Sequence, residues 1–284
     1  MTEDERIDAI RSTYVGHERL ENLIKLAESY MALARRYHEV PCLSIVGNAG
    51  VGKSTVALRL LNKYPPIETK DGANIPVLHL TIPSNATHHT MAQALLESLG
   101  DPRWQSGSTA DKTQRALGLL RDCEVQLIIC DEFHHLYDNN KERILKNEAN
   151  WIKTLIIKSK ISMVIMGGET SIEIIKVNEH LDRRVNRRRV LERFQNDSEF
   201  EKVLYALERE LPLDEQSLLW TPGMVDRIYE ATDGIPARVF DLVKSAAITA
   251  VEQGLPKVDR ATLASAYVDC LRHLRSADRP NPFE

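Results

Sequence analysis

The sequence predicts an α/β protein in which a parallel-sheet core is followed by a small, all-helical module. Short, uninterrupted apolar runs alternate with amphipathic stretches as far as residue 196. Such runs suit central parallel strands that are covered on both faces. Beyond residue 196 only helical periods remain, so the sheet is expected to end there.

The first half of the predicted core alternates helix and strand. Apolar residues recur every three or four positions over residues 18–38, which predicts an amphipathic helix that ends before Pro41. The run Cys42–Val46 predicts a strand, and a glycine-rich turn separates it from a helix over 53–62. A second strand and helix are then expected over residues 76–80 and 87–99.

The second half repeats this alternation. Helices are predicted over residues 110–122 and 142–158, and strands over residues 125–130 and 161–166, with a further short strand over 190–194.

The remaining sequence predicts a helical module and a tail. Helices are expected over residues 199–210, 222–232, 236–253 and 260–274, with proline and glycine between them. Residues 275–284 contain two prolines and little apolar content, which predicts a flexible tail. The expected domains are therefore a core (1–196), a helical lid (197–274) and the tail (275–284).

Composition excludes several classes of protein. The chain has 284 residues, 43% of them hydrophobic, and a formal net charge of −4, so it is neither wholly disordered nor a generally basic polyanion binder. No apolar run reaches the roughly 18 residues that a membrane-spanning helix needs, and the start is acidic, so a cytoplasmic location is expected. The four cysteines form no C-x-x-C pair, which favours free thiols over structural zinc.

The strongest motif matches G-x-x-x-x-G-K-[ST] and lies between a predicted strand and a predicted helix. It consists of Gly47, Asn48, Ala49, Gly50, Val51, Gly52, Lys53 and Ser54. In such a phosphate-binding loop, backbone N–H groups surround the phosphates, Lys53 contacts the β- and γ-phosphates and Ser54 binds Mg²⁺. Thr55 is a candidate for the α-phosphate. A chance glycine loop is the alternative.

A second motif ends the predicted strand 125–130 with two acids. Asp131 is the candidate ligand of Mg²⁺, and Glu132 is the candidate base for the water that attacks the γ-phosphate. The alternative is an ordinary strand that ends in solvated acids. Together the two motifs predict an ATPase that uses ATP and Mg²⁺. The neighbouring His134 and His135 are expected to pack the following loop rather than to bind zinc.

Two arginine features accompany these motifs. Residues 182–193 contain six arginines and two acids, and Arg193 is a candidate arginine finger for a neighbouring subunit, with Arg189 as second candidate. A solvated face remains the alternative. Arg238 lies in the first turn of a predicted helix, where a cation is unfavourable unless an anion such as a nucleotide phosphate is nearby. Its alternative is pairing with a nearby acid.

The order of these motifs resembles that of AAA+ ATPases, and the details are most similar to the TniB/TnsC family of transposition regulators. The strings that carry the resemblance are 129–136, 191–194, 234–238 and 281–283. The resemblance implies a P-loop AAA+ core in which Tyr14 and Val15 line the adenine pocket and Arg238 is the sensor 2 arginine. The chain has His17 where related initiator ATPases commonly have an arginine. Glu169 and Thr170 are the candidates for the sensor 1 residue.

The family implies a protein that assembles on target double-stranded DNA in the ATP state, as in CRISPR-associated transposons. The implied partners are further copies of the chain in a head-to-tail ring or filament, a DDE transposase of the TnsB/TniA type and a TniQ target selector. Residues 84–89 and 106–112 are candidate segments for contacts with the DNA backbone.

Two rival functions remain. A replication initiator or helicase loader shares the motifs, but the lid fills the residues after Phe194 and leaves no room for the usual winged-helix domain. A nucleotide-switched signalling scaffold would bind protein partners and no DNA.

Overall fold

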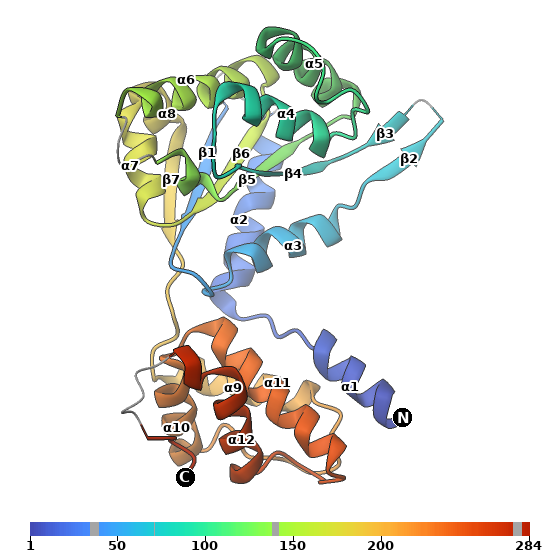
Figure 1. Cartoon of the computed structure of the whole chain (residues 1–284), viewed down its shortest axis with the longest axis vertical. Helices are drawn as coiled ribbons and strands as arrows, with labels where there is room; N and C mark the ends of the chain where they lie inside the picture. Colours follow the sequence, from blue (N-terminus) through green and yellow to red (C-terminus); the bar gives the residue numbers. More distant parts are fainter. Residues whose placement is uncertain (35–39, 71, 138–141, 275–279) are drawn as a thin grey trace. The chain divides into compact units, whose positions relative to one another are not determined.

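The computed structural model describes residues 1–34, 40–70, 72–137, 142–274 and 280–284, and they form two compact units. Residues 19–191 form the sheet unit, and residues 1–18 together with 192–284 form the helical unit (Figure 1). The sequence-based division placed residues 1–18 with the core, whereas in the structure they belong to the helical unit.

The sheet unit is built on five parallel strands in the order β4-β5-β6-β1-β7. The strands are β1 (Cys42–Val46), β4 (Val77–Thr81), β5 (Leu127–Asp131), β6 (Ser162–Gly167) and β7 (Val185–Val190). Every residue of β1, β5 and β6 is buried, as uninterrupted apolar runs predict. The α/β fold class is confirmed.

Helices lie on both sides of this sheet. They are α2 (Glu18–Ala34), α3 (Lys53–Lys63), α4 (His88–Ser98), α5 (Thr109–Asp122), α6 (Glu142–Ser159), α7 (Thr170–Val177) and α8 (Glu179–Arg184). Met163 and Ile165 of β6 belong to the core formed with α4 to α8. On the opposite face of β6, the Ser162 hydroxyl donates to the Tyr30 carbonyl of α2 at 2.9 Å, so α2 covers that face.

The fifth strand differs from its prediction. A strand was expected over residues 190–194, but β7 comprises Val185–Val190 and contains three consecutive arginines. Among the described strands β7 pairs with β1 alone, so it lies at an edge of the sheet. Arg187 and Arg189 are exposed there. An edge strand is less covered than a central one and can carry charged side chains. A prediction based on apolar content therefore placed this strand too late in the sequence.

A short hairpin was also missed. Its strands are β2 (Ile67–Thr69) and β3 (Gly72–Asn74), and they pair antiparallel between α3 and β4 (Figure 1). All three residues of β2 are exposed, so no apolar periodicity marks the hairpin in the sequence.

The helical unit has its own apolar core. Its elements are α1 (Glu3–Ser12), α9 (Ser198–Glu210), α10 (Pro222–Thr232), α11 (Pro236–Glu252), α12 (Arg260–Cys270) and the 3₁₀ turn η2 (Arg272–Leu274). Helix α1, which apolar periodicity did not predict, contributes Ile10 to this core, and the Arg6 Nε donates to the Pro212 carbonyl at 2.8 Å.

Residues 280–284 are packed, although the sequence predicted a flexible tail over 275–284. The Phe283 side chain is 2% exposed within the helical core, and its ring meets that of Tyr267 edge to face. Arg227 donates to the Pro282 carbonyl, and the Arg260 Nε donates to the Phe283 carbonyl at 2.6 Å. A single aromatic side chain gives no periodic signal, so the sequence could not reveal this docking.

Candidate functional site

The glycine-rich segment connects β1 to α3, as the motif predicts. The first residue of the loop, Gly47, donates its N–H to the Gly167 carbonyl at 3.2 Å. A Cβ at Gly47 would lie 2.3 Å from the Leu191 carbonyl oxygen, so only glycine fits there. The loop ends at Gly52, which has a left-handed backbone conformation and directly precedes the first residue of α3.

Lys53 begins α3 and contacts its own loop. Its Nζ donates to the carbonyls of Gly47 and Asn48 at 2.7 and 2.8 Å. Burial lowers the pKa of Lys53, while the charges of Glu132 and Asp131 oppose that shift. Electrostatically, the lysine of the first motif and both acids of the second therefore belong to one site.

Asp131 is the last residue of β5 and is 7% exposed. Burial opposes its ionisation, but the His79 side chain, the Glu132 N–H and Lys53 together lower the pKa of Asp131. The Glu132 N–H donates to one carboxylate oxygen at 2.8 Å, and the His79 Nε2 lies 3.5 Å from the other. Asp131 is thus held as a carboxylate, the form that a divalent cation requires.

Two histidines lie against Glu132. The Nε2 atoms of His134 and His135 are 3.3 and 3.9 Å from the same oxygen, Oε2. The short 3₁₀ helix η1 (Phe133–Leu136) carries both rings, and Glu132 precedes it with a φ of +55°. Sequence reasoning assigned these histidines to loop packing and missed His79, because a lone histidine in a strand carries no motif.

The other candidates are distributed between the two units. Arg189 lies exposed on β7 of the sheet unit. In the helical unit, Arg193 is exposed and Val15 is 6% exposed. Arg238 pairs with Asp233 at 3.1 Å. The structure thus contains the acid partner that was the alternative explanation of this arginine.

Among the remaining candidates, the side chains of Ser54 and Glu169 are exposed, and those of Tyr14, Thr55 and Thr170 are partly buried.

One candidate DNA-contact segment needs correction. Lys112 is fully buried, with its Nζ donating to the Gly107 carbonyl at 3.0 Å and lying 3.3 Å from the His89 Nε2. This cation therefore connects α5 to the preceding loop and to α4 and is not offered to a DNA phosphate.

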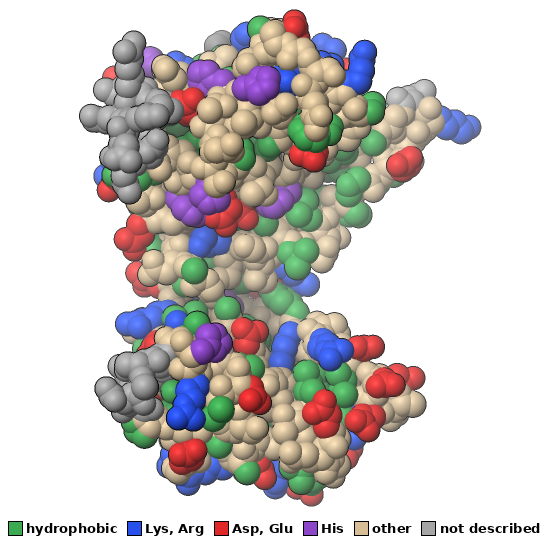
Figure 2. Space-filling model, viewed as in Figure 1, with side chains coloured by type: hydrophobic (Ala, Val, Ile, Leu, Met, Phe, Trp, Pro, Cys, Tyr) green, Lys and Arg blue, Asp and Glu red, His purple; other side chains and the backbone are tan. Residues whose placement is uncertain are grey.

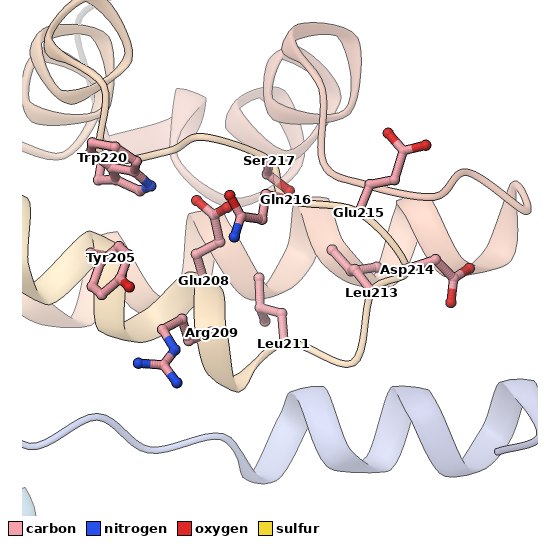
Figure 3. Close-up of a pocket in the computed structure, with 10 residues that line it drawn as sticks. All are labelled: Tyr205, Glu208, Arg209, Leu211, Leu213, Asp214, Glu215, Gln216, Ser217 and Trp220. Atoms are coloured by element: carbon pink, nitrogen blue, oxygen red, sulfur yellow. The ribbon is translucent and has the colours of Figure 1, made fainter.

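The helical unit carries a pocket of about 240 Å³ beside the end of α9 (Figure 3). Its aromatic wall is formed by Tyr205 and Trp220, whose rings meet edge to face at 5.8 Å. The buried Glu208 carboxylate accepts from the N–H groups of Leu218 and Leu219 at 3.0 and 2.8 Å. The pocket contains none of the predicted nucleotide-binding residues.

No helix among the described residues has the length and apolar character to cross a membrane. The four cysteines, all described, are free.

Comparison with known proteins gives a family and a fold. The family model described as "Bacterial TniB protein" matches residues 6–196. No curated protein sequence matches the chain.

Similar solved structures include the Aeropyrum pernix ORC2 protein in ADPNP–ADP complexes, with a TM-score of 0.66 and 16% identity over 92% of this chain and 70% of that one. Cdc6p from Pyrobaculum aerophilum has a TM-score of 0.66 and 14% identity, over 93% of this chain and 71% of that one. The Aeropyrum pernix ORC1 protein in complex with DNA has a TM-score of 0.60 and 18% identity, over 93% of this chain and 69% of that one. At these identities the likeness shows the AAA+ fold.

Proposed function

The chain belongs to the bacterial TniB family, and from this premise we propose that it is an ATP-dependent regulator that assembles on target DNA during transposition. The family points to a transposition AAA+ ATPase, and membership implies ATP hydrolysis. The observation that carries the proposal is that the P-loop follows β1 and Asp131 ends β5 at the same carboxyl edge of the parallel sheet, where Asp131 and Glu132 also affect the pKa of Lys53. A P-loop lysine beside two acids is the constellation of a nucleotide hydrolase.

We assign the residues of this site by their chemistry. The loop 47–52 cradles the phosphates, and Lys53 exchanges its two loop carbonyls for phosphate oxygens. The Ser54 hydroxyl and the Asp131 carboxylate supply the hard oxygen ligands that Mg²⁺ prefers. Glu132 accepts the proton of the attacking water.

The roles of Tyr14, Val15 and Arg238 follow from the family resemblance, and that of the arginine finger follows from the arginine-rich segment 182–193. Tyr14 and Val15 line the adenine pocket, and Arg238 contacts the nucleotide phosphates as sensor 2. Binding then requires Arg238 to exchange Asp233 for the nucleotide. Arg193 acts as the arginine finger of a neighbouring subunit, with Arg189 as the second candidate.

A site completed by a neighbour's arginine requires head-to-tail contacts, which produce a ring or a helical filament. Lys and Arg side chains are scattered among acidic ones on the face shown in Figure 2, and the net charge is −4. The affinity for double-stranded DNA is therefore summed over many weak protomer contacts and falls steeply with salt. A DDE transposase and a TniQ protein are the proposed partners of the assembly.

Imaging by negative-stain electron microscopy tests the proposal. Rings or filaments should form with ATP and duplex DNA, and Lys53→Ala should abolish both nucleotide binding and assembly. Glu132→Gln should retain ATP and give assemblies that outlast those of the wild type. Monomers under every nucleotide condition would refute the assembly, and wild-type hydrolysis by Glu132→Gln would refute the role of Glu132.

A replication-initiator function is the second candidate, because the similar structures include the ORC and Cdc6 proteins. A pull-down with purified proteins separates the two, since an initiator retains a replicative helicase and a transposition regulator retains a transposase. A signalling scaffold would bind nucleotide normally and fail to pellet with DNA.

A further inference from the structure

Glu132 is held in an unusual backbone conformation at the end of β5. Its φ and ψ of +55° and +33° are left-handed, a conformation that is unfavourable for a residue other than glycine. The following residue, Phe133, is fully buried and anchors η1 in the core. The backbone therefore directs the Glu132 side chain, and further contacts must fix its carboxylate.

The 3₁₀ helix η1 packs closely on the end of β6. A Cβ at Gly167 would lie 2.3 Å from the Ser171 Oγ. It would lie 3.1 and 3.2 Å from the backbone nitrogens of His134 and Phe133. Because Gly167 has no side chain, the backbone of η1 can approach β6 this closely. The next residue, Gly168, then donates its N–H to the Nδ1 of His134 at 3.4 Å.

This hydrogen bond selects one form of His134. An Nδ1 that accepts carries no proton, so the proton of the neutral ring is on Nε2. The Nε2 atom of His134 lies 3.3 Å from Oε2 of Glu132. His135 has the opposite form, since its Nδ1 lies 2.8 Å from the Ile82 carbonyl, which can only accept.

Both histidines lie against Oε2 of Glu132, whereas Oε1 forms no hydrogen bond or ion pair with another described residue. We propose that His134 is a positioning residue: its Nε2–H fixes Oε2 of Glu132 and leaves Oε1 to accept the proton from the attacking water. His134 thereby connects Gly168, the residue that follows β6, to the base of the reaction. This inference rests on the proposed hydrolytic role of Glu132.

The same three side chains resemble a metal site, since their ligand atoms lie within 4.8 Å of one another. A metal would need an unprotonated Nε2 on both histidines. The Gly168 N–H places the His134 proton on Nε2, which opposes coordination there. The geometry therefore favours positioning of the carboxylate over metal binding.

Steady-state kinetics of full-length variants, with ATP and duplex DNA, test the role. His134→Ala should lower kcat by about tenfold to a hundredfold, since a misplaced catalytic group costs up to about that much, with little change in nucleotide affinity. His134→Gln keeps an N–H donor near Nε2 and should recover most of the rate. His180→Gln changes an exposed histidine of α8, outside this site, and serves as the control, with a rate near that of the wild type.

A double variant separates positioning from a merely structural role. In a Glu132→Gln background, His134→Ala should cause no further loss of rate, because the carboxylate that it positions is already gone. The proposal would be overturned if His134→Ala lowered the rate of Glu132→Gln as much as it lowers that of the wild type. A loss of nucleotide affinity by His134→Ala equal to its loss of kcat, or a wild-type kcat for this variant, would also overturn it.

Nuclear magnetic resonance of the ¹⁵N-histidine-labelled protein provides a readout that does not depend on hydrolysis. The His134 ring should show the Nε2–H form, and Glu132→Gln should shift its nitrogen signals. An Nδ1–H form would overturn the inference, as would coordination of equimolar Zn²⁺ by both rings. If the wild type binds ATP without hydrolysing it, the proposed function fails while the ring signals still decide the positioning contact.

Discussion

Replacing Phe283 by alanine should undock residues 280–284 and destabilise the helical unit. The ring is 2% exposed, and a phenylalanine side chain of this kind buries about 150–250 Å². At about 25 cal/mol per Å², this burial is worth about 4–6 kcal/mol as an upper bound. The same segment loses about 1–2 kcal/mol of backbone entropy for each residue that it orders.

The two quantities together set the size of the effect. Once the ring is removed, the remaining contacts are the burial of Pro282, two hydrogen bonds from Arg260 and one each from Arg227 and Asn281, each hydrogen bond worth about 1 kcal/mol net. They do not offset the ordering cost of five residues, so the segment detaches. The loss of unfolding free energy is then about 2–4 kcal/mol, slightly below the range for a phenylalanine deep in a rigid core.

Calorimetry of the full chain measures this loss. Such a destabilisation should lower Tm by about 4 °C or more. Phe283→Leu should fall between the wild type and Phe283→Ala. Val268→Ala is a matched control, because Val268 is 40% exposed on the same helix α12 and should change Tm little. An unchanged Tm for Phe283→Ala, with unchanged protease sensitivity of the segment, would refute the docking and restore the flexible tail.

Four other outcomes can be measured with single variants or reagents. Gly47→Ala should abolish nucleotide binding in a filter assay, since the added Cβ would overlap the Leu191 carbonyl, and normal binding would contradict this packing. Lys53→Ala should leave no measurable ATP affinity by calorimetric titration, and retained micromolar affinity would contradict its assignment. Arg193→Ala should preserve ATP binding but slow hydrolysis in the DNA-bound assembly, and full activity would transfer the finger role to another arginine. Burial raises the pKa of Cys42 to about 12, so a thiol reagent at pH 8 should spare Cys42 in the native protein, and rapid modification there would contradict its burial.

Most of the sheet unit could be predicted from the sequence because its signals are local. An apolar run such as Leu127–Asp131 is long enough to be a strand, and the loop 47–52 has spacing that few other structures share. The P-loop and the two acids were placed correctly at strand ends, since parallel strands present their carboxyl ends at one edge.

The features that were missed depend on distant partners. His79 is defined by its distance from Asp131, and the role of His134 depends on the N–H of Gly168. The docking of Phe283 depends on the helical core into which its ring packs. None of these contacts leaves a periodic or fixed-spacing trace in the sequence, so they emerge only when the chain is folded.

The arginines of β7 have a consequence for the chain before it assembles. Strand β7 lies at the edge of the described sheet, and an open edge is a template on which another chain's strand can add. The exposed charges of Arg187 and Arg189 repel such an addition along the whole strand. Before any assembly forms, these arginines therefore also oppose the pairing of one free chain with another along this edge.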